Sequence, residues 1–527
     1  MSRPEPARAL VALGAGVLHG WSMAWPALWQ LELPAIGLQP GQPVWWLQLL
    51  AMGLLASLLQ APQRDGAVSW RVGGLYGALF STAWLSVAFG WLFVAMHTYG
   101  GLPALPAGLA VLVLAALLGL YYAAACAAFQ ALSPASPYKS ALIFAALWLL
   151  AELARGILLT GFAWGAAAYA HADGPLSGFA PWLGAYGMGA LAAWLAMLAV
   201  QWPRQASGAA RLGSVALALV LLALPTLQQA LGPALTQAHG RLGVTLLQGN
   251  IAQDEKFEAG SGVPQALQWY SEQLLQASSS LVIAPETAIP LLPQQLPPGY
   301  WQALRQRFAT GAQAALVGIP LGDFEQGYTN SVVGLRPGDA LAWRYDKHHL
   351  VPFGEFIPTG FRWFTELMHI PLGDFARGPL GQPPFDWQGQ RLAPNVCYED
   401  LFGEELAQQF LDSARTPTVL VNVSNLAWFG GTAAMDQHLQ IARLRAREFE
   451  RPVLMATNTG VTAIIDHQAR VRQSLPRDTR AVLQGEVEGR TGTTPYAWWV
   501  ARLGLWPYGL GAAAVVLWAL RQLRKRR

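Results

Sequence analysis

Residues 106–132 read PAGLAVLVLAALLGLYYAAACAAFQAL and belong to a longer stretch, from Arg71 to Lys139, with no charged residue between its two ends. A membrane-spanning helix needs about 20 apolar residues, so the stretch is long enough for two spans. The Gly- and Pro-rich segment HTYGGLPALP (97–106) separates them. This part of the sequence therefore predicts a membrane protein.

The charge of the chain is unevenly distributed. Its 527 residues are 53% hydrophobic and 12% charged, whereas a typical soluble domain is about 25% charged. Only 13 of the 64 charged residues lie in the first 240 residues, about 5% of that portion, and the other 51 make up about 18% of the remainder. These values exclude a single soluble globule and a disordered chain. The net charge of +4 is small, and several basic residues lie in short loops and at the C-terminal end rather than in a block that would suggest nucleic-acid binding, so no nucleic-acid partner is expected.

The same reasoning extends to the whole chain. It predicts a multi-pass α-helical membrane domain of about eight spans, near 9–29, 44–62, 73–96, 106–132, 140–160, 180–202, 212–230 and 498–520. Lys and Arg gather in alternate short loops and at the C-terminal end, which by the positive-inside rule puts both termini in the cytoplasm. The expected domains are an N-terminal transmembrane domain (1–238), an outward-facing globular domain (239–494), and a last helix with a basic tail (495–527).

Short apolar runs alternate with helical periodicity in the globular part. Strands are expected at 243–251, 280–284, 314–320, 331–336, 340–350, 391–399, 416–424, 451–459 and 462–471. Helices are expected at 263–277, 300–313, 401–414 and 435–450. Such alternation predicts an α/β sandwich built on mixed sheets.

Three expected strand ends carry reactive side chains. Glu286 lies in IAPETAIP, Lys347 in WRYDKHHLVPFGEFIP and Cys397 in NVCYEDLF. A thiol with an ordinary pKa of about 8.5 needs a base at neutral pH, and a partly desolvated carboxylate can serve as that base. A fixed cation and a backbone N–H, here from Lys347 and Tyr398, can stabilise an oxyanion.

Lysine is scarce, which draws attention to the lysines that remain. The chain has 30 Arg but only Lys139, Lys256, Lys347 and Lys525. A compact ammonium has properties that a guanidinium cannot imitate, so the retained Lys347 favours a specific role. The two cysteines, Cys126 in an apolar run and Cys397 in the polar half, do not form a disulfide framework.

The order Glu, Lys, Cys in these contexts resembles the nitrilase (carbon–nitrogen hydrolase) superfamily. The wider pattern resembles one branch of it, the bacterial apolipoprotein N-acyltransferase family, over nearly the whole chain. The segments that carry the resemblance are LLQGNIAQDEKF (246–257), APETAIP (284–290), YDKHHLVPFGEFIP (345–358), CYEDLF (397–402), NVSNLAWFG through NTGVTAIID (422–466) and AELARGILLTGFAW (151–164). The resemblance implies an α-β-β-α sandwich for the globular domain.

The resemblance also implies a ping-pong acyl transfer. Cys397 would attack an acyl ester of a phospholipid to give a thioester. The free α-amine of the N-terminal diacylglyceryl-cysteine of an apolipoprotein would then take the acyl chain, which completes lipoprotein maturation. Glu286 would be the general base, and Lys347 would stabilise the oxyanion.

Further residues and partners follow from the same resemblance. Glu355, Tyr398 and Glu399 would support the catalytic residues, and Trp164, Phe257 and Trp428 would bind substrate. The implied setting is the lipid bilayer of the bacterial inner membrane, with the catalytic domain in the periplasm. No cofactor and no metal are expected, because the adjacent His348 and His349 do not share a ligand face and no metal motif occurs. A monomer is expected.

Some residues depart from the family pattern. They are Phe257, Ala163, Leu426, Asp436 and Met455, and none of them is a catalytic candidate. They leave open a paralogue that acylates a different amine. A membrane-tethered amidase or other nitrilase-like hydrolase, with water as the acceptor, and a non-enzymatic transporter or lipid-binding scaffold also remain as alternatives.

Two features of the apolar regions have two interpretations each. Glu152 and Arg155 share one face of an expected span, where they form either a functional site or a mutually neutralising pair. Two apolar segments either contact lipid or pack onto the helical domain: VPFGEFIP (351–358) and FRWFTELMHIPLG (361–373).

Overall fold

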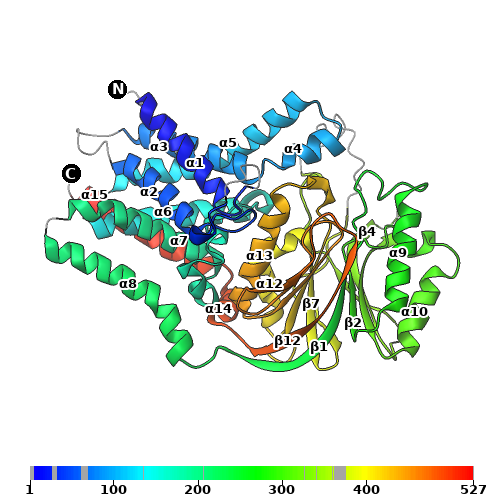
Figure 1. The fold of residues 1–527 in the computed structure, drawn as a ribbon. Coiled ribbons are helices and arrows are strands. Elements are labelled where there is room, and N and C mark those ends of the chain that lie inside the picture. Colours follow the sequence, from blue (N-terminus) through cyan, green and yellow to red (C-terminus); the bar gives the residue numbers. More distant parts are fainter. Residues whose placement is uncertain are drawn as a thin grey trace. The chain divides into compact units, whose positions relative to one another are not determined.

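The computed structural model describes residues 5–26, 32–60, 69–133, 136–205, 207–323, 325, 327–339, 341–358, 360 and 375–525. Its contacts divide the chain into two compact units (Figure 1). The helical unit comprises Met1–Phe93, Ala104–Ala234 and Leu503–Arg527, and the sandwich unit comprises Val94–Pro103 and Leu235–Arg502. The segment 361–373, expected to contact lipid or helices, lies outside the described residues.

The described part of the helical unit consists mainly of apolar helices. Its helices are α1 (Pro6–Trp21), α2 (Trp45–Gln60), α3 (Trp70–Ala88), α4 (Leu92–Val94), α5 (Ala104–Leu132), α6 (Pro137–Ile157), α7 (Ala180–Gln201), α8 (Gly208–Leu231) and α15 (Trp506–Arg524). Short 3₁₀ turns at Pro34–Ile36, Leu158–Thr160, Ala167–His171, Pro175–Phe179 and Trp202–Arg204 connect some of them.

The expectation of about eight spans is not confirmed. Among the described residues, four helices are long and apolar enough to cross a membrane, and up to six if each of two bent pairs counts as one span. The bent pairs are Trp70–Ala88 with Leu92–Tyr99 and Pro495–Leu503 with Trp506–Arg524. Helices α1 and α2 have 16 residues each. At 1.5 Å per residue they extend about 24 Å, which is shorter than a hydrocarbon core of about 30 Å.

Small residues let α3 and α5 pack closely. A Cβ atom on Gly77 of α3 would lie 2.8 Å from the carbonyl oxygen of Tyr122 on α5. The Ser81 hydroxyl donates to the carbonyl oxygen of Gly119 over 3.0 Å. Close backbone approach at small residues is a common way for membrane helices to associate.

The charged pair of α6 is part of a buried network. Arg155 lies 3.3 Å from Glu152, and its Nε donates to the Tyr122 hydroxyl over 2.9 Å. Its Nη1 donates to the carbonyl oxygens of Phe162 and Trp164, each over 2.7 Å. The pair thus neutralises itself and also fixes the loop that follows α6.

The sandwich unit contains two six-stranded mixed sheets. One has the order β12-β1-β2-β3-β4-β5 and the other β11-β10-β9-β8-β7-β6. β1, β2 and β3 are parallel in the first sheet, as are β7, β8 and β9 in the second, and the outer pairs are antiparallel. The strands are β1 (Thr236–Gln248), β2 (Leu281–Ala284), β3 (Ala314–Asp323), β4 (Gly327–Leu335), β5 (Trp343–Asp346), β6 (Phe385–Trp387), β7 (Gln390–Val396), β8 (Val419–Ser424), β9 (Val453–Thr457), β10 (Ala463–Ile465), β11 (Val471–Ser474) and β12 (Ala481–Gly492).

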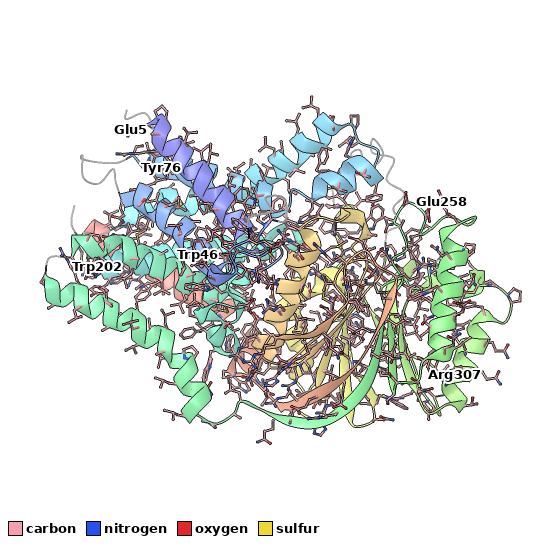
Figure 2. The ribbon with its side chains drawn as sticks, in the orientation of Figure 1. Glu5, Trp46, Tyr76, Trp202, Glu258 and Arg307 are labelled. Atoms are coloured by element: carbon pink, nitrogen blue, oxygen red, sulfur yellow. The ribbon has the colours of Figure 1, made fainter. Side chains whose placement is uncertain are left out.

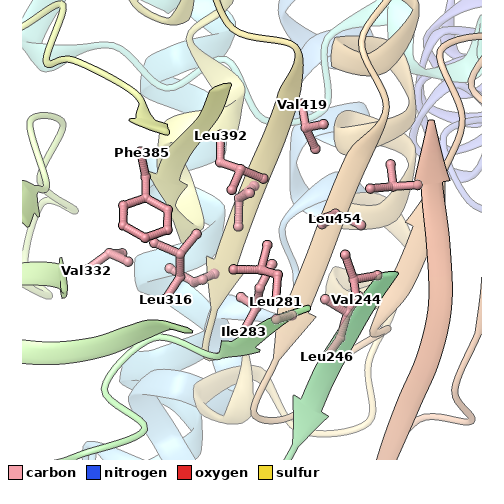
Figure 3. Packing of buried hydrophobic residues seen from close by; sticks show 14 of the residues in the cluster. Val244, Leu246, Leu281, Ile283, Leu316, Val332, Phe385, Leu392, Val419 and Leu454 are labelled. Atoms are coloured by element: carbon pink, nitrogen blue, oxygen red, sulfur yellow. The ribbon is translucent and has the colours of Figure 1, made fainter. Parts of the chain in front are cut away.

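The core of this unit lies between the two sheets (Figure 3). Val244 and Ile283 of the first sheet pack in one buried cluster with Phe385, Leu392 and Leu454 of the second. Burial of each such aliphatic or aromatic side chain contributes roughly 1.5–3 kcal/mol to folding. The core therefore holds the two sheets face to face.

Helices cover the outer faces of the sheets (Figure 1). α9 (Gly262–Gln276) and α10 (Tyr300–Thr310) bury their apolar sides on β2 and β3, and α13 (Ala434–Phe449) packs on β9. Arg307 of α10, labelled in Figure 2, donates to the carbonyl oxygen of Leu275 near the end of α9 over 3.3 Å. The unit is thus an α-β-β-α sandwich.

Several elements differ from the sequence-based expectation. The helix expected at 401–414 is replaced by short turns: a 3₁₀ turn at Cys397–Leu401, α12 (Gly403–Leu406) and a 3₁₀ turn at Ala407–Phe410. Strands β6 and β12 were not expected. Residues 94–103 and α14 (Pro495–Leu503, up to Arg502) cluster with the sandwich unit, whereas the expected boundaries place them in the transmembrane parts.

Candidate active site

Cys397 directly follows β7, at the carboxyl end of a parallel strand. Its φ is +54°, a left-handed backbone conformation that is uncommon for a residue with a side chain and costs energy. Two contacts hold this turn. The Asn422 side chain donates to the Cys397 carbonyl oxygen over 3.2 Å, and the backbone N–H of Val396 donates to Glu399 over 2.6 Å. The partly buried thiol is therefore held on a sharp, strained turn.

Glu286 lies in the turn after β2, and only 8% of it is exposed. The Asn330 side chain donates to one carboxylate oxygen over 2.7 Å, and the backbone N–H of Asn425 donates to the other over 2.9 Å. Asn425 directly follows β8, so the second sheet contributes to the position of a side chain from the first.

Lys347 directly follows β5 and is buried. Its Nζ atom lies 2.9 Å from Glu355 and 3.6 Å from Glu286. Burial alone would lower the pKa of Lys347, but the charges of Glu355 and Glu286 outweigh burial and raise it. The ammonium group therefore stays charged and has a fixed position.

Glu355 is held by the loop in which it lies and by β4. The backbone N–H of Val351 donates to it over 2.9 Å, and Asn330 donates to it over 2.8 Å. Since Asn330 also donates to Glu286, its one amide group bridges both carboxylates. Its backbone carbonyl oxygen accepts the N–H of Lys347 over 2.8 Å.

Glu399 joins the turn of Cys397 to the segment that carries Lys347. It accepts the Tyr345 hydroxyl over 2.9 Å and the backbone N–H groups of His348 and His349 over 2.6 and 3.1 Å. Burial raises the pKa of Glu399 to about 7, although Lys347 and the backbone donors act to lower it. The side chain thus connects two of the three expected catalytic segments.

The thiol of Cys397 is protonated at rest. Burial raises the pKa of Cys397 well above its ordinary value, and the charge of Glu286 raises it further, whereas Lys347 lowers it. A thiol in this state reacts only if a base removes its proton during the attack. Glu286 is the carboxylate with the largest charge effect on the thiol, which suits it to that task.

The residues expected to bind substrate lie in both units. Phe257 and Trp428 belong to the sandwich unit, where 55% and 37% of their surfaces are exposed. Trp428 also contacts Tyr99, with ring centroids 6.1 Å apart. Trp164 belongs to the helical unit, is buried and packs edge-on against Trp91 at 4.8 Å. Their role in substrate binding stays a prediction.

Tyr398 is buried beside the turn of the thiol. Its ring packs on His349 and Phe402, with centroids 5.6 and 5.2 Å away. The Nδ1 atom of His349 lies 2.9 Å from a carboxylate oxygen of Glu405. In the described part of the chain, no group of three or more His, Cys, Asp or Glu side chains is arranged to hold a metal ion.

Several site residues were not identified from the sequence. Asn330 lies among the polar residues of β4, between Thr329 and Ser331, so nothing in the sequence of the strand set it apart. His438 of α13 contacts Asp400 over 3.1 Å and the Cys397 carbonyl oxygen over 3.4 Å. Lys256 lies beside Glu286, and the scarcity of lysine pointed to it as much as to Lys347.

The family departures fit local packing. Leu426 and Met455 are fully buried, and Ala163 is nearly so. Asp436 pairs with Arg477 over 2.9 Å. None of these residues disturbs the contacts among Glu286, Lys347 and Glu355.

Comparison with known proteins bears on both units. Residues 33–198 match the model of the apolipoprotein N-acyltransferase N-terminal domain, and residues 243–496 match the carbon–nitrogen hydrolase model. A protein of Verminephrobacter eiseniae named apolipoprotein N-acyltransferase is 55% identical, over 98% of this chain and 97% of its own length. The chain belongs to the apolipoprotein N-acyltransferase family.

A second curated relative agrees with this assignment to the apolipoprotein N-acyltransferase family. The Ralstonia nicotianae protein of the same name is 44% identical over 92% of this chain and 90% of its own length. A carbon–nitrogen hydrolase structure from Helicobacter pylori is 18% identical with a TM-score of 0.34, over 51% of this chain and 94% of that chain. The chain is an acyltransferase with a nitrilase-like domain, and its apolar helices fit a membrane protein.

Proposed function

We propose that this acyltransferase moves an acyl chain from a phospholipid to the α-amino group of the N-terminal diacylglyceryl-cysteine of lipoproteins, through a thioester on Cys397. The observation that carries the proposal is the buried group of side chains around the thiol. In this group, the charges of Glu286 and Lys347 act on the protonated thiol of Cys397. The ammonium group of Lys347 lies within ion-pair distance of the carboxylates of Glu286 and Glu355.

In the first step, the sulfur of Cys397 attacks the ester carbonyl carbon while Glu286 takes the thiol proton. The carbonyl oxygen becomes an oxyanion, which the ammonium of Lys347 and the backbone N–H of Tyr398 stabilise. Collapse of the intermediate breaks the ester C–O bond, and the leaving oxygen takes the proton from Glu286. The products are a lysophospholipid and an acyl thioester.

In the second step, the α-amine of the acceptor attacks the thioester carbonyl carbon. Glu286 takes a proton from the attacking nitrogen, and the same donors stabilise the second oxyanion. The C–S bond then breaks, and the proton on Glu286 returns to the sulfur. An amide forms and the free thiol is restored, so one carboxylate serves both steps.

The family and the helical unit support a location in the bacterial inner membrane. We place the sandwich unit in the periplasm, and both termini in the cytoplasm, on the basis of the Lys and Arg distribution. Both substrates are lipids of that membrane. An active site tethered there turns a search in three dimensions into a local one.

The test is mass spectrometry of a synthetic diacylglyceryl lipopeptide incubated with the purified full-length protein and phosphatidylethanolamine. The wild type is expected to add one acyl chain to the peptide and to carry a hydroxylamine-sensitive adduct at Cys397. The variants Cys397→Ala and Cys397→Ser are expected to yield neither, with the melting temperature of the wild type. N-acylated peptide from purified Cys397→Ala would refute the mechanism.

The same assay separates the acyltransferase from a hydrolase. A membrane-tethered hydrolase would use water, so it would release free fatty acid and leave the peptide unmodified. Acylation of an unrelated amine, but not of the lipopeptide, would indicate a different acceptor.

A further inference from the structure

A second buried lysine contacts the turn that carries Glu286. Lys256 belongs to the loop between β1 and α9, and only 1% of it is exposed. Its Nζ atom donates to the backbone carbonyl oxygen of Glu286 over 3.1 Å and to the Thr287 hydroxyl over 2.6 Å. The ammonium group thus binds the general base's own residue and the next one along the chain.

The turn that Lys256 binds is strained. Thr287 has a φ of +46°, a left-handed conformation that is rare and energetically costly for a β-branched residue. A Cβ atom on Gly318 of β3 would clash with the Pro285 carbonyl oxygen and lie 2.8 Å from the Glu286 Cα atom. The turn is therefore packed tightly against β3 and is also bound by a charged donor.

The charges around the thiol explain why a second cation is useful. Lys347 alone faces two carboxylates, Glu286 and Glu355, which leaves one negative charge in excess. Formation of a thiolate or an oxyanion adds another negative charge in a region of low dielectric, where like charges are costly. A protonated Lys256 offsets the excess negative charge of Lys347, Glu286 and Glu355 before the reaction begins.

The electrostatic neighbours of Lys256 support this arrangement. Burial lowers the pKa of Lys256 to about 8, while the charges of Glu286 and Cys397 act to raise it. These two are the titratable groups that act on Lys256, and Glu286 links it to Lys347 and Glu355. At neutral pH the group is mostly protonated, and it loses its charge as the pH rises through about 8.

We propose that Lys256 is a positioning residue for acyl transfer: it holds the strained turn of Glu286 and supplies the second positive charge that offsets the two carboxylates as negative charge builds up on the sulfur and the oxyanion. This inference rests on the proposed transfer through Cys397. It assigns the two lysines separate roles, because Lys347 faces the reacting atoms and Lys256 acts through Glu286.

The experiment measures the rate of thioester formation at Cys397 between about pH 6 and pH 10. Full-length protein is mixed with phosphatidylethanolamine that carries a labelled acyl chain, and the adduct is quenched and counted. The variants are Lys256→Met and Lys256→Arg, with Lys525→Met as the control for loss of an exposed lysine of the helical unit. Melting curves confirm that each variant is folded.

Lys256→Met is expected to slow thioester formation by about tenfold or more at pH 7, with an unchanged phospholipid concentration for half-maximal rate. In the wild type the rate is expected to fall as the pH rises above about 8. Lys256→Arg is expected to keep most of the rate at pH 7 and to move that fall upward by about one pH unit or more, because a guanidinium stays protonated.

A wild-type rate and pH profile in Lys256→Met would overturn the inference, as would an unchanged alkaline fall in Lys256→Arg. If one variant does not fold, the other decides by the same criterion. If the wild type itself forms no adduct at Cys397, the proposed function fails together with the inference. If the wild type forms the adduct and Lys256→Met forms it at the same rate, the inference about Lys256 is overturned while the proposed function stands.

Discussion

At the residue scale, Asn330 determines how close the two carboxylates of the site can lie. Its single amide group donates to Glu286 and to Glu355, and Lys347 forms ion pairs with both. Carboxylates held this close repel each other unless donors and a cation intervene. The site therefore depends on a neutral side chain as much as on its charged ones.

Asn330→Asp tests this dependence. The substitution keeps the size of the side chain but replaces a donor with a third carboxylate, so thioester formation is expected to fall by about 100-fold or more. Asn330→Leu, which removes both hydrogen bonds without adding charge, is the matched control and is expected to fall less. Equal losses in a quenched thioester assay would contradict the charge argument.

Lys347→Arg is expected not to behave as a conservative change. The charge remains, but Lys347 faces the reacting atoms, where a planar guanidinium cannot reproduce the donor geometry of a compact ammonium 2.9 Å from Glu355. N-acylation of the lipopeptide is expected to drop by about 100-fold, whereas the exposed Lys139→Arg retains wild-type activity. Turnover within about twofold of the wild type would argue against the oxyanion role.

The sequence pointed to Glu286, Lys347 and Glu355 but did not identify Asn330, His438 or Lys256 as parts of the site. Glu286, Lys347 and Glu355 lie within ion-pair distance, as their motifs imply. Asn330 and His438 escaped notice because their roles come from pairings across the fold. A single chain read by periodicity contains no signal for those pairings.

At the scale of elements, the turn after β7 and helix α13 are coupled by one ion pair. His438 of α13 contacts Asp400 over 3.1 Å. Burial alone would lower the pKa of His438, but the charge of Asp400 and its hydrogen bond outweigh burial and raise it above 6.5. The stabilisation is then fully present below pH 6.5 and is lost as the pH rises through the raised pKa.

Thermal unfolding at two pH values checks this coupling. Between about pH 6 and pH 9, the Tm of the wild type is expected to fall by about 2 °C more than that of His438→Gln, because the variant has no ionisable partner for Asp400. The exposed His239→Gln is the control for loss of a histidine. If the Tm of His438→Gln changes with pH as the Tm of the wild type does, the His438–Asp400 ion pair does not contribute to the pH dependence of stability.

The helix expected at 401–414 shows where periodicity misleads. Its apolar spacing is helical, but the chain leaves the helical region at Phe402, where φ is −104° and ψ is 76°. Arg445 of α13 lies against Gly403, where a Cβ atom would clash with it. Tertiary packing divides the segment into short turns, and the sequence of the segment alone does not contain that information.

At the scale of the whole molecule, the charge distribution predicted the presence of a membrane part but not its number of crossings. Counting each bent pair as one span gives five candidates before the sandwich unit and one after it. The two 16-residue helices α1 and α2 add either two crossings or none, if both behave alike. The number before the sandwich unit is odd in both cases, so the proposed orientation does not depend on them.

Labelling of single cysteines tests that orientation. In a Cys397→Ala background, Glu258→Cys of the sandwich unit, at the exposed position labelled in Figure 2, is expected to react with a membrane-impermeant maleimide in intact spheroplasts. Lys525→Cys, near the C-terminal end, is expected to react only after permeabilisation. The opposite pattern would reverse the proposed topology.

Residues 94–103 have a practical consequence for work on this enzyme. They lie between helices of the helical unit in the sequence but cluster with the sandwich unit, where Tyr99 packs against Trp428. A recombinant fragment that begins at residue 235 and ends at residue 502 would lack this segment and leave one face of Trp428 bare. Inhibitor screens and soluble truncations based on that fragment would present a surface that the intact chain does not have.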